Sequence, residues 1–258
     1  MRNLILEEPY SAAAIWSRRL AAFAIALGLI AILLARSRIV DIGAALAVLG
    51  AAIFFACAAV LCALSGAVVI WRLGRRGIGY VGAGLALALL VLAVPSWMAV
   101  QAMRLPLIND ISTDLIDPPF FSRSSRAIAA RDNIDHPPIP AEWRDDQRAA
   151  YPAVQPIVLD LDVEEAWPLV LKAVEARKWR VIEQIKPGGR SGVGHIDAVD
   201  RTLIMGFPDD VTVRVKPLAG QTRIDVRSAS RYGRHDFGAN AKRIQAFSDE
   251  LQAQLDAR

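Results

Sequence analysis

The sequence predicts an α-helical membrane anchor of three transmembrane helices, followed by a C-terminal α+β domain with a mainly antiparallel sheet covered by two helices. Three observations lead to this fold class. The 258-residue chain is 54% hydrophobic, which is too apolar for an ordinary soluble protein. Its first hundred residues contain three long stretches without a charged side chain. The remainder combines strand-like and helix-like apolar patterns, separated by turn residues.

The three uncharged stretches predict membrane spans near residues 20–40, 42–71 and 77–103. Each charge at a bilayer centre costs about 2.5 to 3.5 kcal/mol, so uncharged runs of this length are typical of transmembrane helices. The first run, residues 20–35, makes only about 24 Å of helix, and its flanking arginines must therefore reach toward the headgroups. A cleaved signal peptide does not explain this run, because it has no small-x-small cleavage site and two further spans follow.

The distribution of charge excludes a nucleic-acid partner and predicts an orientation. The formal net charge is +4, but the basic excess lies in the apolar half, and residues 105–258 carry 21 basic against 23 acidic groups. Arginines near span ends divide six against four, which predicts a cytoplasmic N-terminus and an extracytoplasmic C-terminal domain. The six are Arg2, Arg18, Arg19, Arg72, Arg75 and Arg76, and the four are Arg36, Arg38, Arg104 and Arg123.

A proline-rich segment, residues 105–152, follows the anchor. Proline lacks a backbone N–H and excludes long helices and central strands, so we predict a linker. Apolar side chains between Leu107 and Phe121 indicate that its first half docks onto a folded part. The prolines are Pro106, Pro118, Pro119, Pro137, Pro138, Pro140 and Pro152.

Residues 153–258 are predicted to form the α+β domain. Asp162, with Glu165 three residues later, is typical of a capping box and begins a helix that runs to about Arg177. A second helix begins near Asp236, with apolar residues at intervals close to 3.6. The first strands are expected at residues 155–161, 179–186, 195–198 and 203–207.

The clearest predicted pairing is a hairpin formed by residues 211–216 and 223–227. Valine and isoleucine alternate there with charged residues, which gives one apolar and one charged face. Two registers keep valine opposite valine. One pairs Arg214 with Asp225, and the other pairs Asp210 with Arg227.

Three segments of the domain resemble a known family. They are DDVTVRV at 209–215, IDVRSASRYGRHDFGANAKRI at 224–244, and INDISTD at 108–114 followed by Pro118 and Pro119. They resemble the family catalogued as domain of unknown function 1499, and the similarity covers roughly residues 105–255. The resemblance implies a largely bacterial family, often with membrane spans and without an established activity. With the predicted spans, it leads us to expect a multi-pass protein of the bacterial inner (plasma) membrane.

A basic segment between the last strand and the last helix is a candidate anion site. Residues 211–243 carry eight basic side chains against Asp225 and Asp236. Guanidinium groups beside a helix N-terminus are suited to an anionic ligand, and we hypothesise a lipid headgroup or a phosphate near the membrane surface. The candidate residues are Arg227, Ser228, Ser230, Arg231, Arg234, Asn240 and Arg243.

The same residues have a structural interpretation. Asp236 is then a helix cap, the serines close a turn, and Arg227 or Arg231 pairs with Asp209 or Asp210. A further alternative is a scaffold without ligand that docks other envelope proteins through its domain and the small residues of its spans. The expected partners are thus the lipid bilayer, with anionic lipids or envelope proteins as candidates.

Patterns that indicate catalysis or cofactors are weak. Ser230, His235 and Asp236 supply the residue types of a triad without a nucleophile elbow, so a hydrolase or transferase acting on an envelope substrate is kept only as an alternative. The motif G-x-G-x-x-G at residues 77–82 opens an apolar span and is read as helix packing. We expect no metal and no cofactor, because the three histidines lack ligand spacing.

Overall fold

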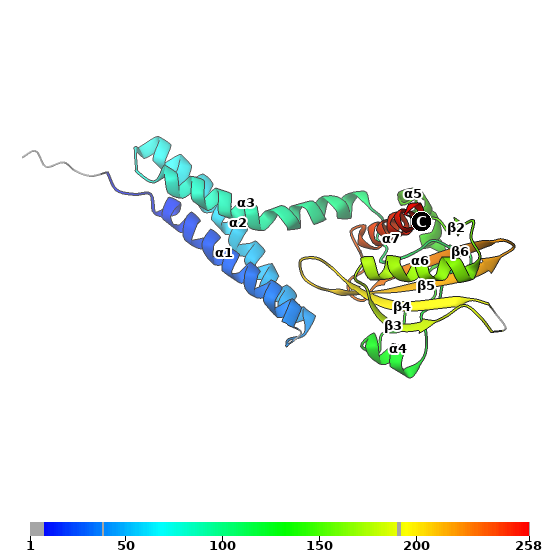
Figure 1. The fold of residues 1–258 in the computed structure, drawn as a ribbon. Coiled ribbons are helices and arrows are strands. Elements are labelled where there is room, and N and C mark those ends of the chain that lie inside the picture. The colour runs from blue at the N-terminus through cyan, green and yellow to red at the C-terminus, as the bar shows by residue number, and fades with distance from the viewer. Residues whose placement is uncertain (1–7, 38, 190–191, 258) are drawn as a thin grey trace, which may run out of the picture. The chain divides into compact units, whose positions relative to one another are not determined.

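The computed structural model describes residues 8–37, 39–189 and 192–257, and it divides into two compact units, residues 1–100 and 101–258 (Figure 1). Each unit is described by itself. Arg2 and Arg38, which entered the prediction of orientation, lie outside the described residues. The predicted fold class is confirmed: three long apolar helices precede an α+β domain with an antiparallel sheet.

The anchor consists of α1 (Ala12–Ser37), α2 (Ile42–Leu73) and α3 (Ile78–Arg104). All three are long and apolar enough to cross a bilayer, so the chain is a multi-pass membrane protein with lipid as its surroundings. Helix α1 has 26 residues, which corresponds to about 39 Å. It is longer than the uncharged run because it begins before Arg18 and Arg19 and ends after Arg36.

Small residues let α1 pack closely on the other two helices. A Cβ atom added at Gly66 of α2 would lie 2.8 Å from the backbone N of Ala14. A Cβ atom at Gly84 of α3 would lie 2.8 Å from the backbone carbon of Ser17. The Ser17 hydroxyl also donates to the Tyr80 carbonyl at 3.3 Å. Association therefore depends on close backbone approach, as is usual where lipid offers no hydrophobic gain.

We predict that Gly84→Leu destabilises the anchor and that Gly82→Leu does not. The first change forces α1 away, because overpacking costs about 1 to 3 kcal/mol. Gly82 is the matched control, since nothing lies within 4 Å of a Cβ atom placed there. Thermal unfolding of the full chain in detergent measures the difference, and equal melting temperatures for the two variants would contradict the packing described.

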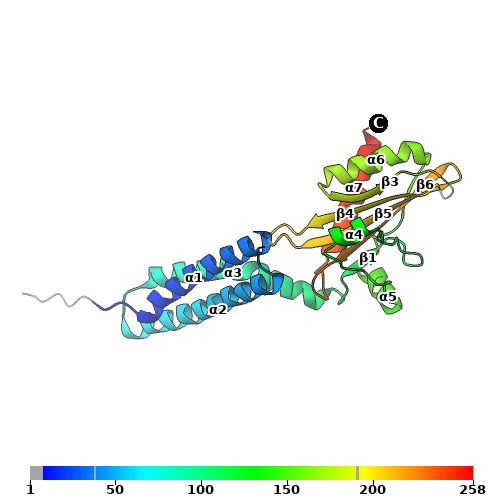
Figure 2. The ribbon, with the colours of Figure 1, turned by 90° about the horizontal axis from the view of Figure 1, so that it is seen from below.

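The second unit is built on a six-stranded sheet in which every pairing is antiparallel. The strand order is β1-β6-β5-β4-β3, and β2 also pairs with β6. Helices α6 and α7 cover one face of the sheet (Figures 1 and 2). The elements are β1 (Asp110–Ser112), α4 (Ser125–Ala130), α5 (Ala141–Ala150), β2 (Ile157–Leu159), α6 (Val163–Ala176), β3 (Arg180–Ile185), β4 (Gly194–Arg201), β5 (Pro208–Leu218), β6 (Gln221–Ser230) and α7 (Ala239–Asp256).

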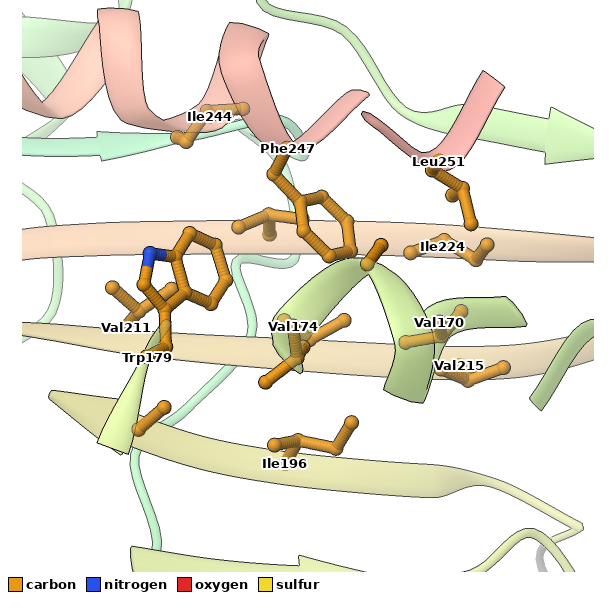
Figure 3. Packing of buried hydrophobic residues seen from close by; sticks show 14 of the residues in the cluster. Val170, Val174, Trp179, Ile196, Val211, Val215, Ile224, Ile244, Phe247 and Leu251 are labelled. Atoms are coloured by element: carbon orange, nitrogen blue, oxygen red, sulfur yellow. The ribbon is translucent and has the colours of Figure 1, made fainter. Parts of the chain in front are cut away.

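The core lies between the sheet and the two covering helices, as Figure 3 shows. Alternate residues of β5 and β6 face the helices, and the register pairs Val213 with Val226. Arg214 then lies opposite Asp225, which is the first of the two predicted registers. At one end of the core, the rings of Trp179 and Phe247 stack with their centroids 5.2 Å apart (Figure 3).

The segment expected as a linker differs most from the prediction. Strand β1 pairs with the end of β6, with Asp110 opposite Ala229, and the compact unit begins at Gln101. Helix α4 places Ala127 against Ile182 and Val199. Prolines exclude long elements, but a strand of three residues and helices of six and ten residues fit between them.

Three local predictions also need correction. Residues 203–207 are not a strand but part of a turn, in which the Phe207 carbonyl accepts from Thr202 and Gly206 has a positive φ of 70°. Asp162 is the N-cap of α6, yet its side chain makes no capping hydrogen bond. The last helix begins at Ala239, after Gly238 in the left-handed region, and not at Asp236.

We predict that Phe247→Ala lowers the free energy of unfolding of the domain by about 3 to 5 kcal/mol, because it opens a cavity against Trp179. Urea unfolding of the full chain in a mild detergent, followed by near-ultraviolet circular dichroism, measures this loss. Ile185→Ala, at a half-exposed position on β3, is the control and changes stability by less than about 1 kcal/mol. Similar losses in both variants would mean that the core lies elsewhere.

Candidate functional site

The candidate anion residues divide between the two faces of the sheet. On the face toward the helices, Arg243 of α7 reaches two neighbouring strands. Its Nε donates to Asp200 at 2.6 Å, and its Nη2 donates to Asp209 at 2.5 Å. Its Nη1 donates to the side chains of Ser228 and Asn240. Burial raises the pKa of Asp209, although the adjacent guanidinium acts in the opposite direction.

The turn of residues 231–238 is tied to the sheet by Asn240 and Asp236. The Asn240 amide donates to the Ser230 hydroxyl at 2.9 Å and to the Asn109 carbonyl at 3.0 Å. The Asp236 carboxylate accepts from the backbone N–H groups of Gly238 and Asn240, both at 2.9 Å. Asp236 thus satisfies N–H groups at the start of α7, although the N-cap residue of that helix is Gly238.

On the opposite face, Arg231 binds Asp210 through two nitrogens. The Nε and Nη2 atoms lie 3.0 and 2.7 Å from carboxylate oxygens, and Nη1 donates to Asp132 at 2.6 Å. His136 Nε2 is 2.8 Å from the same Asp210 carboxylate. The side chains of Arg231 and Asp210 are buried, and their ion pair compensates for the hydration that both charged groups lose.

The Arg231–Asp210 ion pair is one of the alternatives that the structural interpretation offered, whereas Arg227 has another partner. Its Nε and Nη2 bind Asp110, at 3.0 and 2.7 Å, and not Asp209 or Asp210. Nη1 also donates to the Pro119 carbonyl, and Nη2 to the Pro137 carbonyl. Burial raises the pKa of Asp110, against the effect of Arg227. Sequence reasoning did not suggest Asp110 as a partner because it belongs to the segment expected as a linker.

A third cluster lies on the same face toward the other end of the hairpin. Asp225 binds Arg214 and Arg223, at 2.8 and 2.9 Å, and both arginines also bind Asp114. Burial opposes ionisation of Asp114, but backbone N–H groups of Asp117 and Ile116 and the two guanidinium groups outweigh it. The pKa of Asp114 therefore lies below its usual value of 3.8.

The structure thus brings together four of the seven candidates, Ser228, Ser230, Asn240 and Arg243, in one hydrogen-bonded group. Arg227 and Arg231 are bound to carboxylates on the opposite face. Arg234 differs from the other arginines, since it is exposed and no carboxylate within the described ranges forms an ion pair with it. The acidic partners that sequence reasoning missed include Asp110, Asp114, Asp132 and Asp200. For the first two, the INDISTD motif was an available signal.

The residues considered for catalysis do not form a triad. His235 accepts through Nδ1 from the backbone N–H of Phe237, and its ring stacks on Phe237. The Ser230 hydroxyl binds Asn240, and no hydrogen bond joins it to His235 in the part of the chain that the structure describes. No group of three possible metal ligands occurs among these described residues either. The other two histidines contact Asp210 and Asp197.

We predict that the domain loses stability below about pH 4 and that Asp114→Asn removes part of this dependence. Since the pKa of Asp114 is lowered by folding, its ionised form stabilises the fold above the unfolded-state pKa, and this contribution disappears as the pH falls through the folded-state pKa. At pH 7 the variant loses about 1 to 3 kcal/mol, the worth of charge-assisted hydrogen bonds.

Urea unfolding at pH 7 and at acid pH measures both effects. Asp145→Asn is the control, because that carboxylate is exposed and its partner Arg148 lies on the same helix. A difference between Asp114→Asn and the natural chain that persists unchanged in acid would rule out the proposed role of Asp114.

Comparison with known proteins gives a family but no activity. No curated protein matches the chain. Residues 110–251 match the model of a family described as a protein of unknown function, DUF1499. The match includes β1, α6, most of α7 and the clusters described above. Because it extends over more than half of the sequence, the chain belongs to the DUF1499 family.

Proposed function

We propose that this chain is a non-catalytic binding module of the bacterial cell envelope, held in the inner membrane by its three helices. In this proposal the extracytoplasmic α+β domain rests on the bilayer and binds anionic headgroups at one end of its sheet. The excess of arginine around the N-terminal segment and the second loop supports the orientation. The observation that carries the proposal is an exposed apolar loop at the end of the sheet where the chain leaves α3.

This end of the sheet is close to the third helix along the chain. Helix α3 ends at Arg104, and residues 105–109 then run beneath the turn of residues 231–238. The Asn109 carbonyl accepts from Ser230 at 2.8 Å, and the Asn109 amide donates to the Gly233 carbonyl at 2.6 Å. Five extended residues reach at most about 18 Å, and this short connection supports the proposal that the turn contacts the membrane surface.

Apolar and basic side chains at this end suit the bilayer interface. Leu203, in the loop between β4 and β5, is 91% exposed, and Ile204 and Tyr232 are also exposed. The rings of Phe207 and Tyr232 lie 6.5 Å apart, which places the loop beside the turn that carries Arg234. Apolar tips flanked by aromatic rings and arginines are typical of surfaces that enter the headgroup region.

The backbone of the loop supports the same interpretation. Thr202 donates to the Phe207 carbonyl and accepts from Gly206, both at 2.9 Å. The Arg201 guanidinium donates to the Gly206 carbonyl. Because these groups are satisfied within the loop, placing it among headgroups costs little backbone desolvation. The buried arginines of the two faces have no part in this proposal, since carboxylates already bind them.

We expect a fluorophore at position 203 to report contact with lipid. Leu203→Cys, in a chain with Cys57 and Cys62 replaced by alanine, is labelled with NBD and reconstituted in phosphatidylcholine vesicles with or without phosphatidylglycerol. NBD emission should shift to the blue and be quenched by headgroup-proximal quenchers, more strongly with phosphatidylglycerol. Arg234→Ala should reduce that lipid dependence about fivefold, as expected for about 1 kcal/mol per arginine at an anionic surface.

Val158→Cys provides the matched control. Val158 is half exposed on β2, which pairs with the opposite end of β6, so its label should emit as in water. Water-like emission at position 203 in both vesicle types would overturn the proposal. A blue shift without quenching by lipid would instead indicate a protein partner and favour the docking scaffold.

A further inference from the structure

We infer a second site in the domain, separate from the turn and the loop: a cavity that binds a small molecule with one carboxylate and an apolar body. The cavity has a volume of about 500 Å³, which lies within the range of small-molecule sites. It is formed between Arg227 of β6 and the segment of residues 116–144. The inference does not rest on membrane contact.

Half of the twelve residues that line the cavity are apolar. Phe121 and Ile139 are buried in it, and Pro138 lies beside them. Phe120 and Ile116 also line it but are mostly exposed, so they mark its opening to solvent. An apolar body of the ligand can therefore pack against the exposed Ile116 and Phe120, where it replaces water.

Most charged groups of the lining are already neutralised. All three nitrogens of Arg227 are bound to Asp110 or to the Pro119 and Pro137 carbonyls. His136 contacts Asp210 at 2.8 Å. At the exposed rim, Arg123 lies 3.7 Å from Asp135. Asp117, also on the rim, accepts from Arg214 at 2.7 Å.

Arg144 of α5 is the exception. Its Nε atom is shielded from solvent and has no hydrogen-bond partner. No carboxylate in the described ranges 8–37, 39–189 and 192–257 forms an ion pair with Arg144. Arg144 lines the cavity and its side chain is only half-buried, so its outer N–H donors are available to a ligand in the cavity.

The chemistry of Arg144 indicates the class of ligand. A guanidinium group presents parallel N–H donors that match the two oxygens of a carboxylate. One uncompensated cation suits a single negative charge, whereas a phosphate dianion would meet Asp117 and Asp135 at the rim without a second free cation. Charge and apolar walls together favour an amphipathic monoanion over an inorganic anion.

The cavity is held in shape by buried ion pairs. The Arg227 guanidinium donates to the carbonyls of Pro119 and Pro137, which precede and follow α4 in the sequence. Arg131, at the end of α4, binds Asp197 of β4 at 2.9 Å and the Ser122 carbonyl. These contacts fix the covering segment before any ligand arrives, which reduces the entropy that binding must overcome.

Isothermal titration calorimetry of the full chain in zwitterionic nanodiscs tests this site with 4-phenylbutyrate. Its neutral and cationic counterparts, 4-phenylbutan-1-ol and 4-phenylbutylamine, are the ligand controls, and empty nanodiscs give the background. We expect saturable binding of the carboxylate, with Arg144→Met raising its Kd at least about tenfold, or about 1.4 kcal/mol. Arg148→Met, on the same helix with its side chain 65% exposed, should leave the Kd unchanged.

Three outcomes would overturn the inference: no saturable binding of 4-phenylbutyrate, equal Kd values for the natural chain and Arg144→Met, or equally tight binding of the alcohol or the amine. Melting temperatures show whether Arg144→Met is folded. If it is not, Arg144→Lys takes its place, with an expected loss of at least about threefold because lysine lacks the planar fork. An unchanged Kd in that variant also overturns the inference. Arg234→Ala should not affect this binding, so this result is independent of the headgroup proposal.

Discussion

The pairing of buried arginines with buried aspartates is the constraint on which the domain depends. In a sheet covered on one face, the alternate side chains of the other face normally meet water. Here the segment of residues 113–140 covers much of that face, and Asp210, Asp225 and Arg227 are buried beneath it. Isolated buried charges are too costly to persist, so each needs an opposite charge. The covering segment is therefore positioned largely by ion pairs, whereas α6 and α7 are positioned by apolar packing.

This division explains how much of the fold could be predicted from sequence. The uncharged runs identified the anchor because a bilayer excludes charge, and the alternation around Val213 and Val226 identified the hairpin because one face is apolar. The same alternation left two registers, and the observed one matches Arg214 with Asp225. The spacing of Ile244, Phe247 and Leu251 identified the final helix because 3.6-residue periodicity places them on one side. Each success used a local pattern.

The partners of the charged face could not be predicted in this way. Asp110 and Arg227 are 117 positions apart, and Arg231 and Asp132 are 99 apart. Residues so far apart in sequence form no periodic pattern, and the prolines around Asp110 resemble those of a linker.

The prediction of a strand at residues 203–207 failed for another reason. An apolar run predicts burial, but a pattern does not distinguish burial in a protein core from exposure of Leu203 at the surface.

A binding function is best sought at arginines for which the described residues supply no carboxylate partner. The domain pairs Arg214, Arg227, Arg231 and Arg243 with carboxylates. An exposed cation such as Arg234 is stabilised by hydration and needs no carboxylate partner. Arg144 is half-buried at the edge of a cavity, and no carboxylate within the described residues pairs with it. That cavity is therefore more informative about binding than the buried arginines of the family signature, which carboxylates already bind.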